Sequence, residues 1–259
     1  MDNSVGPKIS AVVMIYNEER QIKDCLETIK WVDEIVICDS FSTDRTVEIC
    51  RKYTDKIFQR KFDNFGNQKK WLLDKPSYQW VLFVEADERF SPELAVEIRQ
   101  RLAIDEGYDG YWIPFKNFVF GQQMKGDFWN FKKIKLFKKE KGSWQDKFVH
   151  AGFILNGVAG CLSNYVFHYP YPNLKIMLTK QSRAVRLEAR QLLNSNKRIG
   201  WGDAFRALYW VPLRFIKFFF LMKDYKSGFA GLIFCLVTSF YEIGIIYHYW
   251  KLKLWEKQV

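Results

Sequence analysis

Acidic residues follow an apolar run near the middle of the first half of the chain. Glu85, Asp87 and Glu88 come directly after residues 80–84, whose β-branched and aromatic side chains predict a buried strand. Glu85 and Asp87 are two residues apart, so on an extended chain they project to the same side. Ligands bind at the carboxyl ends of strands in open α/β sheets, and carboxylates are ligands for hard divalent ions. The pattern predicts a divalent-ion and diphosphate site, with a surface turn before the next helix as the alternative.

Polar residues also follow two earlier strand-like runs. Residues 9–16 are apolar and end at Asn17 and Glu18, and residues 34–38 end at Asp39. Apolar residues at helical spacing follow each run, so we expect parallel strand–helix repeats, with Asn17 capping the first helix. The sequence contains neither GxGxxG nor GxxxxGK[ST], which argues against a dinucleotide-binding oxidoreductase or a P-loop nucleotidase. Nucleotide binding through carboxylates and a metal fits these strand ends better.

The composition indicates a folded protein that attracts anions. With 48% hydrophobic residues over 259 positions, the chain can bury a sizeable core and disorder is excluded. The five cysteines form no CxxC pair and the first residues are polar, so we expect a cytoplasmic protein with reduced thiols. A net charge of +11 predicts attraction to nucleic acid, anionic membranes or phosphorylated small molecules. Three histidines are too few, at their spacing, for a His-based zinc site.

Aromatic strands and a polar loop follow the acidic segment. Residues 111–120 are strand-like, and Pro114 predicts an edge or bent strand. Residues 131–139 alternate lysine with apolar side chains, which indicates a strand with one basic face. Residues 144–150 form a polar, aromatic loop of the kind that lines acceptor sites.

Taken as an ordered set, these motifs resemble the family 2 inverting glycosyltransferases of the GT-A fold. The motifs are VVMIYNEE, WVDEIVICDSFSTDRT, FGNQKKW and WVLFVEADERFSPEL. The bacterial lipopolysaccharide-core type is most similar, because it shows a VH element followed by an HY element, here Val149-His150 and His168-Tyr169. The resemblance implies an α/β fold with a GT-A, Rossmann-like, mostly parallel sheet flanked by helices over residues 1–172. A helical extension, membrane-associating or oligomerising, would occupy residues 173–259.

The resemblance also implies roles for individual residues. Binding of a nucleotide-sugar, with a UDP-sugar favoured, is assigned to Tyr16, Glu18, Asp39, Lys69 and Glu85. Asp87 would bind Mn²⁺ or Mg²⁺ beside the diphosphate, and Glu85 stands where the family has the first Asp of its DxD motif. For Asp39, capping of the following helix is the alternative role.

A catalytic base is expected in the loop at residues 144–150. Inversion needs a base that takes the proton of the acceptor hydroxyl as it attacks the sugar. Family members often carry Glu directly after the VH histidine, where this sequence has Ala151, so we expect Asp146 to be the base. His150 is the second candidate catalytic residue, with binding of the acceptor or diphosphate, or packing in the core, as alternatives.

The C-terminal extension contains an amphipathic segment. On a helix over residues 203–223, Arg206, Arg214 and Lys217 share one side and bulky apolar side chains lie opposite. This pattern is typical of an interfacial helix on anionic lipid, and Pro212 should kink it.

Residues 229–250 are apolar apart from Glu242 and His248. We expect a monotopic or re-entrant hairpin rather than a transmembrane helix, because a glutamate at depth would be costly. A helix pair packed on a neighbouring subunit, and thus a homo-oligomer, is the alternative.

These expectations combine into one function. The chain would be a metal-dependent inverting glycosyltransferase of the hexosyltransferase type, cytoplasmic and peripheral on the inner face of the cell membrane. Its acceptor would be a lipid-linked or cell-envelope glycan, such as lipopolysaccharide core or a polyprenyl-linked saccharide. Transfer to polyprenyl phosphate or a peptide side chain, or a non-catalytic basic module that binds anionic lipid or nucleic acid, are the alternatives. No nucleic-acid recognition motif is present, so a nucleic-acid partner is not expected.

Overall fold

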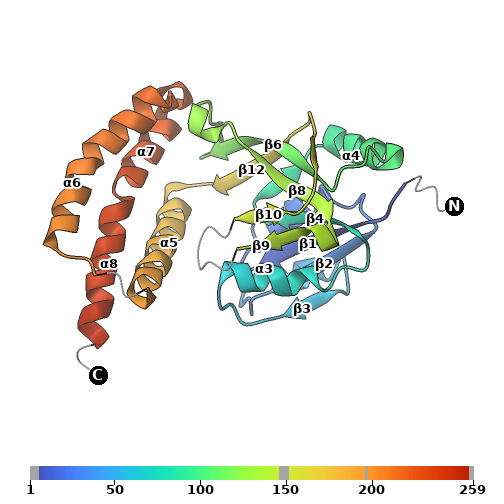
Figure 1. Cartoon of the computed structure of the whole chain (residues 1–259), viewed down its shortest axis with the longest axis horizontal. Helices are drawn as coiled ribbons and strands as arrows, with labels where there is room; N and C mark the ends of the chain where they lie inside the picture. Colours follow the sequence, from blue (N-terminus) through green and yellow to red (C-terminus); the bar gives the residue numbers. More distant parts are fainter. Residues whose placement is uncertain (1–5, 146–151, 196–197, 257–259) are drawn as a thin grey trace. The chain divides into compact units, whose positions relative to one another are not determined.

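The computed structural model describes residues 6–145, 152–195 and 198–256 of the chain (Figure 1). The chain forms two compact units. The first comprises Met1–Lys116 and Phe131–His168, and the second comprises Asn117–Asn130 and Tyr169–Val259.

A mixed sheet forms the centre of the first unit, with the strand order β3-β2-β1-β4-β8-β6-β12-β5 (Figure 1). Its parallel strands are β1 (Ile9–Ile15), β2 (Glu34–Asp39), β3 (Ile57–Gln59) and β4 (Trp80–Glu85). Its other strands are β5 (Glu88–Phe90), β6 (Gly110–Val119), β8 (Lys132–Lys138) and β12 (Val166–Tyr171). The expected α/β fold, with a mostly parallel sheet flanked by helices, is confirmed.

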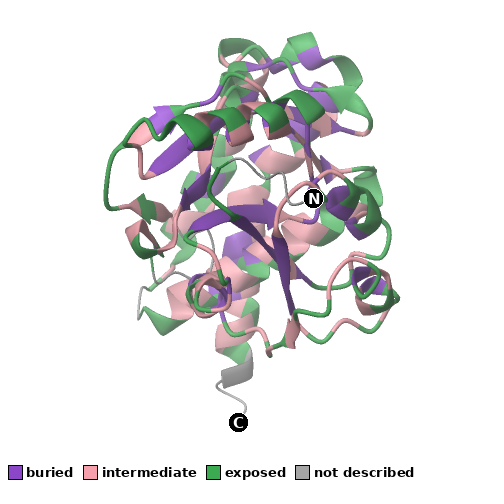
Figure 2. Ribbon diagram, turned by 90° about the vertical axis from the view of Figure 1, so that its right-hand side faces the viewer, coloured by how far each residue is buried: buried purple, intermediate pink, exposed green. Residues whose placement is uncertain are grey.

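Three helices connect the parallel strands, namely α1 (Ile22–Glu27), α2 (Thr46–Cys50) and α3 (Phe65–Leu73). A fourth, α4 (Pro92–Ile104), leads from β5 to β6. α4 forms as the sequence predicts, because the Ser91 hydroxyl accepts from Leu94 N–H and Pro92 occupies the first helical position. Buried residues gather in the strands, drawn purple in Figure 2, and make hydrophobic clusters on both faces of the sheet.

Several short elements lie between these strands and helices. They are β7 (Gln122–Gln123), the 3₁₀ turns η1 (Asp127–Trp129) and η2 (Lys139–Lys141), β9 (Gly142–Trp144), β10 (Phe153–Leu155) and β11 (Ala159–Cys161). β9 and β10 form an antiparallel pair of their own.

The expectation that Asn17 caps the first helix is wrong. Of the two alternatives for the strand that contains Pro114, the edge strand is wrong, and the strand has an irregular register between Tyr111 and Trp112. The N-cap position of α1 is Gln21, and Asn17 has a left-handed backbone (φ 54°), from which its side-chain oxygen accepts a distant N–H. β6, which contains Pro114, lies between β8 and β12 rather than at an edge. Pro114 is tolerated there because it faces Lys132, the first residue of β8, where that ladder ends.

Packed helices form most of the second unit (Figure 1). They are α5 (Leu174–Asn194), α6 (Trp201–Ile216), the π-helical turn η3 (Lys217–Leu221), the 3₁₀ turn η4 (Asp224–Ser227), α7 (Gly228–Ser239) and α8 (Tyr241–Glu256). Val185 and Ala189 of α5 pack against Ile245 and Tyr249 of α8. α6 lies along α7 and α8 and stays helical through Pro212, and its regular turns end at η3.

α7 continues into α8 with Phe240 between them, so the hairpin expected within residues 229–250 does not form. Among the described residues, the run Asp224–Leu254 is long and apolar enough to cross a membrane, and its most apolar 18-residue window has a mean hydropathy of 2.0. The core helix of a water-soluble protein can meet the same criterion, and 39% of the most apolar window is buried within the protein. Glu242 on this run pairs with Arg214 of α6.

Candidate functional site

The parallel strands bring three of the predicted site residues to neighbouring strand ends. In the sheet register, Met14 of β1 faces Cys38 of β2 on one side and Glu85 of β4 on the other. Tyr16, Asp39 and Glu85 therefore lie at or just beyond the carboxyl ends of adjacent strands, the edge at which such sheets bind ligands. The Tyr16 side chain is exposed there, whereas Asp39 is buried.

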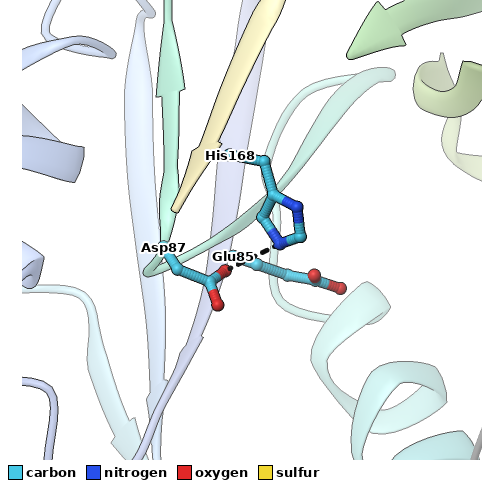
Figure 3. Close-up of side chains that lie close together, drawn as sticks. All are labelled: Glu85, Asp87 and His168. Carbon is cyan, nitrogen blue, oxygen red and sulfur yellow. Dashed lines mark ion pairs between the residues drawn. The ribbon is translucent and has the colours of Figure 1, made fainter. Parts of the chain in front are cut away.

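Glu85, Asp87 and His168 form a cluster of potential metal ligands (Figure 3). Glu85 ends β4, Asp87 lies in the turn before β5, and His168 comes from β12, where it faces Glu88 in the register. One donor atom from each lies within 4.8 Å of the others, and His168 Nε2 is 3.7 Å from Asp87 Oδ1. Two carboxylates and an imidazole suit a borderline divalent ion such as Mn²⁺, so this donor set fits a metal.

Lysine side chains approach Glu85 from α3 and from β8. Lys69 Nζ lies 3.7 Å and Lys135 Nζ 3.6 Å from Glu85 Oε1. Lys69 also lies over the ring faces of Phe83 and Trp144, at 4.9 and 5.9 Å from the ring centroids. The predicted residues Lys69 and Glu85 are thus brought together with Asp87.

The electrostatics of this cluster follow from burial and from the lysines. Lys135 holds the pKa of the Glu85 carboxyl well below its usual range, against the opposing effect of burial. Burial lowers the pKa of Lys69, although Glu85 opposes the shift. Burial also lowers the pKa of His168, with Asp87 opposing it. At neutral pH the site therefore presents an ionised Glu85 and a neutral imidazole, the form in which His binds a metal.

Arg89 holds the turn that carries Asp87. Its guanidinium donates to the carbonyl oxygens of Ala86, Glu88 and Gln21, each at 2.8 Å. The Glu88 side chain closes the turn from within, because its Oε2 accepts the Glu85 N–H at 3.0 Å. The backbone at Asp87 is therefore fixed by contacts within the protein.

Asp39 is held by hydrogen bonds at the end of β2. Its carboxylate accepts the Ser42 N–H at 3.1 Å and the Gln59 side-chain amide at 3.1 Å. It does not cap α2, whose N-cap position is Arg45. The capping alternative for Asp39 is therefore wrong, and the carboxylate instead organises the loop after β2.

The loops after β1 and β2 are bonded to each other. The Asn17 N–H donates to Ser42 Oγ at 2.9 Å, and the Thr43 N–H donates to Asn17 Oδ1 at 2.8 Å. The Glu18 N–H donates to Thr46 Oγ1 at 2.8 Å. These bonds place Tyr16 and Glu18 beside the loop that Asp39 organises.

The predicted catalytic residues Asp146 and His150 lie outside the described residues. On either side of them, the Gln145 N–H donates to Gly152 O at 3.0 Å. Trp144, just before Asp146, packs on Phe83 with ring centroids 5.1 Å apart. The chain thus enters and leaves this segment close to the strand that ends in Glu85.

Sequence reasoning did not assign site roles to His168, Lys135 and Glu88. His168 carried a signal in its HY motif, but only the pairing of β12 with β5 places it against Asp87. Lys135 was predicted on a basic strand face, yet in the structure it is 3% exposed. A lysine between two apolar residues, opposite a strand that ends in acids, was the available signal.

Residues 10–158 match the sequence profile described as glycosyl transferase family 2, which is more than half of the chain. The chain belongs to this family. It is therefore a glycosyltransferase, and the resemblance drawn from its motifs is confirmed.

The chain is similar to several known proteins. The lipopolysaccharide core biosynthesis glycosyltransferase LpsC of Rhizobium meliloti is 23% identical over 90% of this chain and 88% of its own length. An uncharacterized glycosyltransferase of Rickettsia conorii is 26% identical over 93% of this chain and 89% of its own length. Among solved structures, S. aureus TarS 1–349 in complex with UDP-GlcNAc is 16% identical, with a TM-score of 0.48 over 97% of this chain and 92% of that one.

Proposed function

We propose that this family 2 enzyme is a metal-dependent inverting glycosyltransferase that takes its sugar from a UDP-sugar. The observation that supports it most directly is the convergence of Glu85, Asp87 and His168 at the carboxyl end of β4. Lys69 at this cluster suits a diphosphate, because its side chain reaches the carboxylates that would take the metal.

Asp87 and His168 would hold Mn²⁺ or Mg²⁺, with Glu85 beside them. Bound there, the ion would supply positive charge to the leaving diphosphate as the glycosidic bond breaks. Lys69 would bind a phosphate oxygen, because its ammonium already lies within reach of the same edge. Tyr16, Glu18 and Asp39 would bind the base and ribose, since their loops are bonded together at the ends of β1 and β2.

Asp146 would act as the base that takes the proton of the acceptor hydroxyl, with His150 binding the acceptor or diphosphate. The described residues that flank them support this role, because Trp144 packs beside the strand that carries Glu85. We expect Asp146→Asn to abolish transfer while leaving the Kd for UDP unchanged. A variant that transfers sugar at the wild-type rate would remove Asp146 from this role.

We propose a lipid-linked or cell-envelope glycan as the acceptor, and the name of the relative LpsC, a lipopolysaccharide core biosynthesis glycosyltransferase, supports this class. The enzyme would be cytoplasmic and bind the inner face of the cell membrane through α6. Trp201, Phe205 and Tyr209 of this helix lie one turn apart and are 74, 69 and 67% exposed. The basic residue Arg206 lies on the same helix, and basic residues beside an apolar face are typical of helices that bind anionic lipid.

The enzymatic proposal is tested by hydrolysis and transfer assays on purified protein. We expect UDP release from a UDP-sugar to require Mn²⁺ or Mg²⁺ and to fall at least ~100-fold in Asp87→Ala, because charge stabilisation at the leaving group is lost. Asp55→Asn is the control, since Asp55 is an exposed carboxylate in the same unit. Turnover that persists in EDTA would refute metal dependence.

The membrane proposal is tested by replacing Trp201, Phe205 and Tyr209 with Ser. We expect the triple variant to lose binding to vesicles that contain anionic lipid while keeping UDP-sugar hydrolysis. The control replaces Val96 and Ile104 of α4 with Ser, since these apolar residues are also exposed, at 57 and 69%. It should bind vesicles as the wild type does. If the wild-type protein does not bind vesicles and the triple variant is monomeric where the wild type is oligomeric, these aromatic residues form a subunit interface instead.

A further inference from the structure

Lys135 is a buried lysine for which the proposed reaction has given no role. It lies on β8, next to β4 in the sheet, with its side chain 4% exposed. Its ammonium lies 5.4 Å from the ring centroid of Phe83 and 5.8 Å from that of Phe115. Because burying a charge costs several kcal/mol unless partners compensate, the site must provide those partners.

The partners of Lys135 are the carboxylates at the two ends of the turn around Asp87. Lys135 Nζ lies 2.6 Å from Glu88 Oε1 and 3.6 Å from Glu85 Oε1. The shorter contact is an ion pair at hydrogen-bonding distance. Glu88 is fully buried, and its second oxygen accepts the Glu85 N–H. A single ammonium therefore connects Glu85, Glu88 and the backbone between them.

Lys69 differs from Lys135 in its secondary-structure element, in its exposure and in its further carboxylate contacts. It comes from a helix, its side chain is 15% exposed, and Glu85 is the carboxylate it approaches among the described ion pairs. Lys135 comes from a strand, its side chain is 4% exposed, and it lies against the buried Glu88. Lys69 can therefore exchange Glu85 for a phosphate, whereas Lys135 is placed to hold Glu85.

We propose that Lys135 is a positioning residue of the divalent-ion site, which holds the Glu85 carboxylate in register with Asp87 and His168. The inference rests on the proposed metal-dependent function and adds a residue that touches neither metal nor substrate. Partners that orient metal ligands typically change metal affinity ~10–100-fold when they are removed. We expect a change of that size on loss of Lys135.

The first experiment measures Mn²⁺ binding in the presence of UDP by the loss of the free Mn²⁺ signal in electron paramagnetic resonance. Lys135→Met keeps most of the apolar part of the side chain and removes its charge, and we expect at least ~10-fold weaker Mn²⁺ binding. Lys138→Met is the matched control, because Lys138 lies on the same strand and pairs with Asp109 at 3.1 Å. It should bind Mn²⁺ as the wild type does.

A second variant distinguishes two roles of Lys135, namely positioning the Glu85 carboxylate and neutralising the buried charge of Glu88. Lys135→Met alone leaves Glu88 buried without its ion-pair partner, so Tm should fall. Glu88→Gln with Lys135→Met removes both charges, so we expect Tm to recover largely while Mn²⁺ binding stays weak. Recovery of wild-type Mn²⁺ affinity in this double variant would overturn the proposal. Lys135 would then only neutralise the charge of Glu88 and would not position Glu85.

Glu85→Gln keeps the test decisive even if the Lys135 variants do not fold. Its side chain is 36% exposed, so the substitution leaves the buried Glu88–Lys135 pair intact. If Lys135 acts through Glu85, this variant must show the same weak Mn²⁺ binding, and unchanged affinity would overturn the proposal. Wild-type protein that binds no Mn²⁺ with UDP would instead refute the metal site itself. Wild-type binding together with unchanged Lys135→Met would refute the positioning role alone.

Discussion

Replacing Glu34 with Gln should lower the free energy of unfolding by about 3 kcal/mol at neutral pH and by almost nothing near pH 2. Glu34 begins β2, and its side chain is 5% exposed. Its carboxylate accepts the Ser77 N–H at 2.8 Å and the Ser77 hydroxyl at 2.7 Å, and it also binds Ser10 Oγ and Lys56 Nζ. It therefore joins the starts of β1 and β2 to the loop before β4.

The magnitude follows from the pKa of Glu34. Burial raises that pKa, but the hydrogen bonds from Lys56, Ser10 and Ser77 outweigh it and lower the pKa from 4.5 to about 2. Each pKa unit corresponds to about 1.4 kcal/mol, so the ionised form stabilises the fold by about 3 kcal/mol. Because the pKa is lower in the folded state, this stability is complete above pH 4.5 and is lost as the pH falls through about 2.

Urea unfolding followed by tryptophan fluorescence at pH 7, 5 and 3 would measure this dependence. Wild type and Glu34→Gln should differ most at pH 7 and converge as the pH falls. Glu48→Gln is the control, because Glu48 pairs with Arg45 on an exposed helix face and such pairs contribute little. A stability difference that stayed the same from pH 7 to pH 3 would refute the reasoning, since it would show a packing effect rather than a titrating carboxylate.

Other substitutions give further predictions. Burial raises the pKa of Asp224 from 3.8 to about 6, because the buried position favours the neutral carboxyl. The protein therefore loses stability as the pH rises through 6 and Asp224 becomes charged. Asp224→Asn should therefore raise Tm relative to wild type at pH 8 and leave it unchanged at pH 4, and equal effects at both would contradict this. Gly126→Ala should lower Tm sharply, because its Cβ would lie 1.9 Å from Asp224 Oδ1, and an unchanged melting curve would disprove the close approach. Asp39→Ala should raise the KM for the UDP-sugar ~10-fold by releasing the Ser42 N–H, whereas an effect on kcat alone would place Asp39 elsewhere in the reaction.

Much of the first unit could be predicted because its signals are local. Ser91 and Pro92 define the start of α4, and the acids at 85 and 87 follow the strand whose end they mark. The parallel order of β1, β2 and β4 follows from strand–helix repeats, so the shared edge could be expected as well.

The remaining features depend on contacts distant in sequence. Asn17 has the side chain of a helix cap, but its left-handed backbone directs it to Thr43 in the next loop. The partners of Lys135 are set by the register of β8 on β4, which a lysine-alternating pattern does not contain. The proximity of His168 to Asp87 requires β12 to pair with β5, a strand far from it in the sequence.

Arg89 has a consequence for the thermodynamics of donor binding. Its hydrogen bonds to Ala86, Glu88 and Gln21 fix the Asp87 turn without any ligand. The backbone that carries Asp87 is therefore already ordered when metal and nucleotide bind, so binding causes little further loss of conformational entropy in this turn. Arg89→Met should consequently shift Mn²⁺–UDP binding in calorimetry toward a larger entropic penalty.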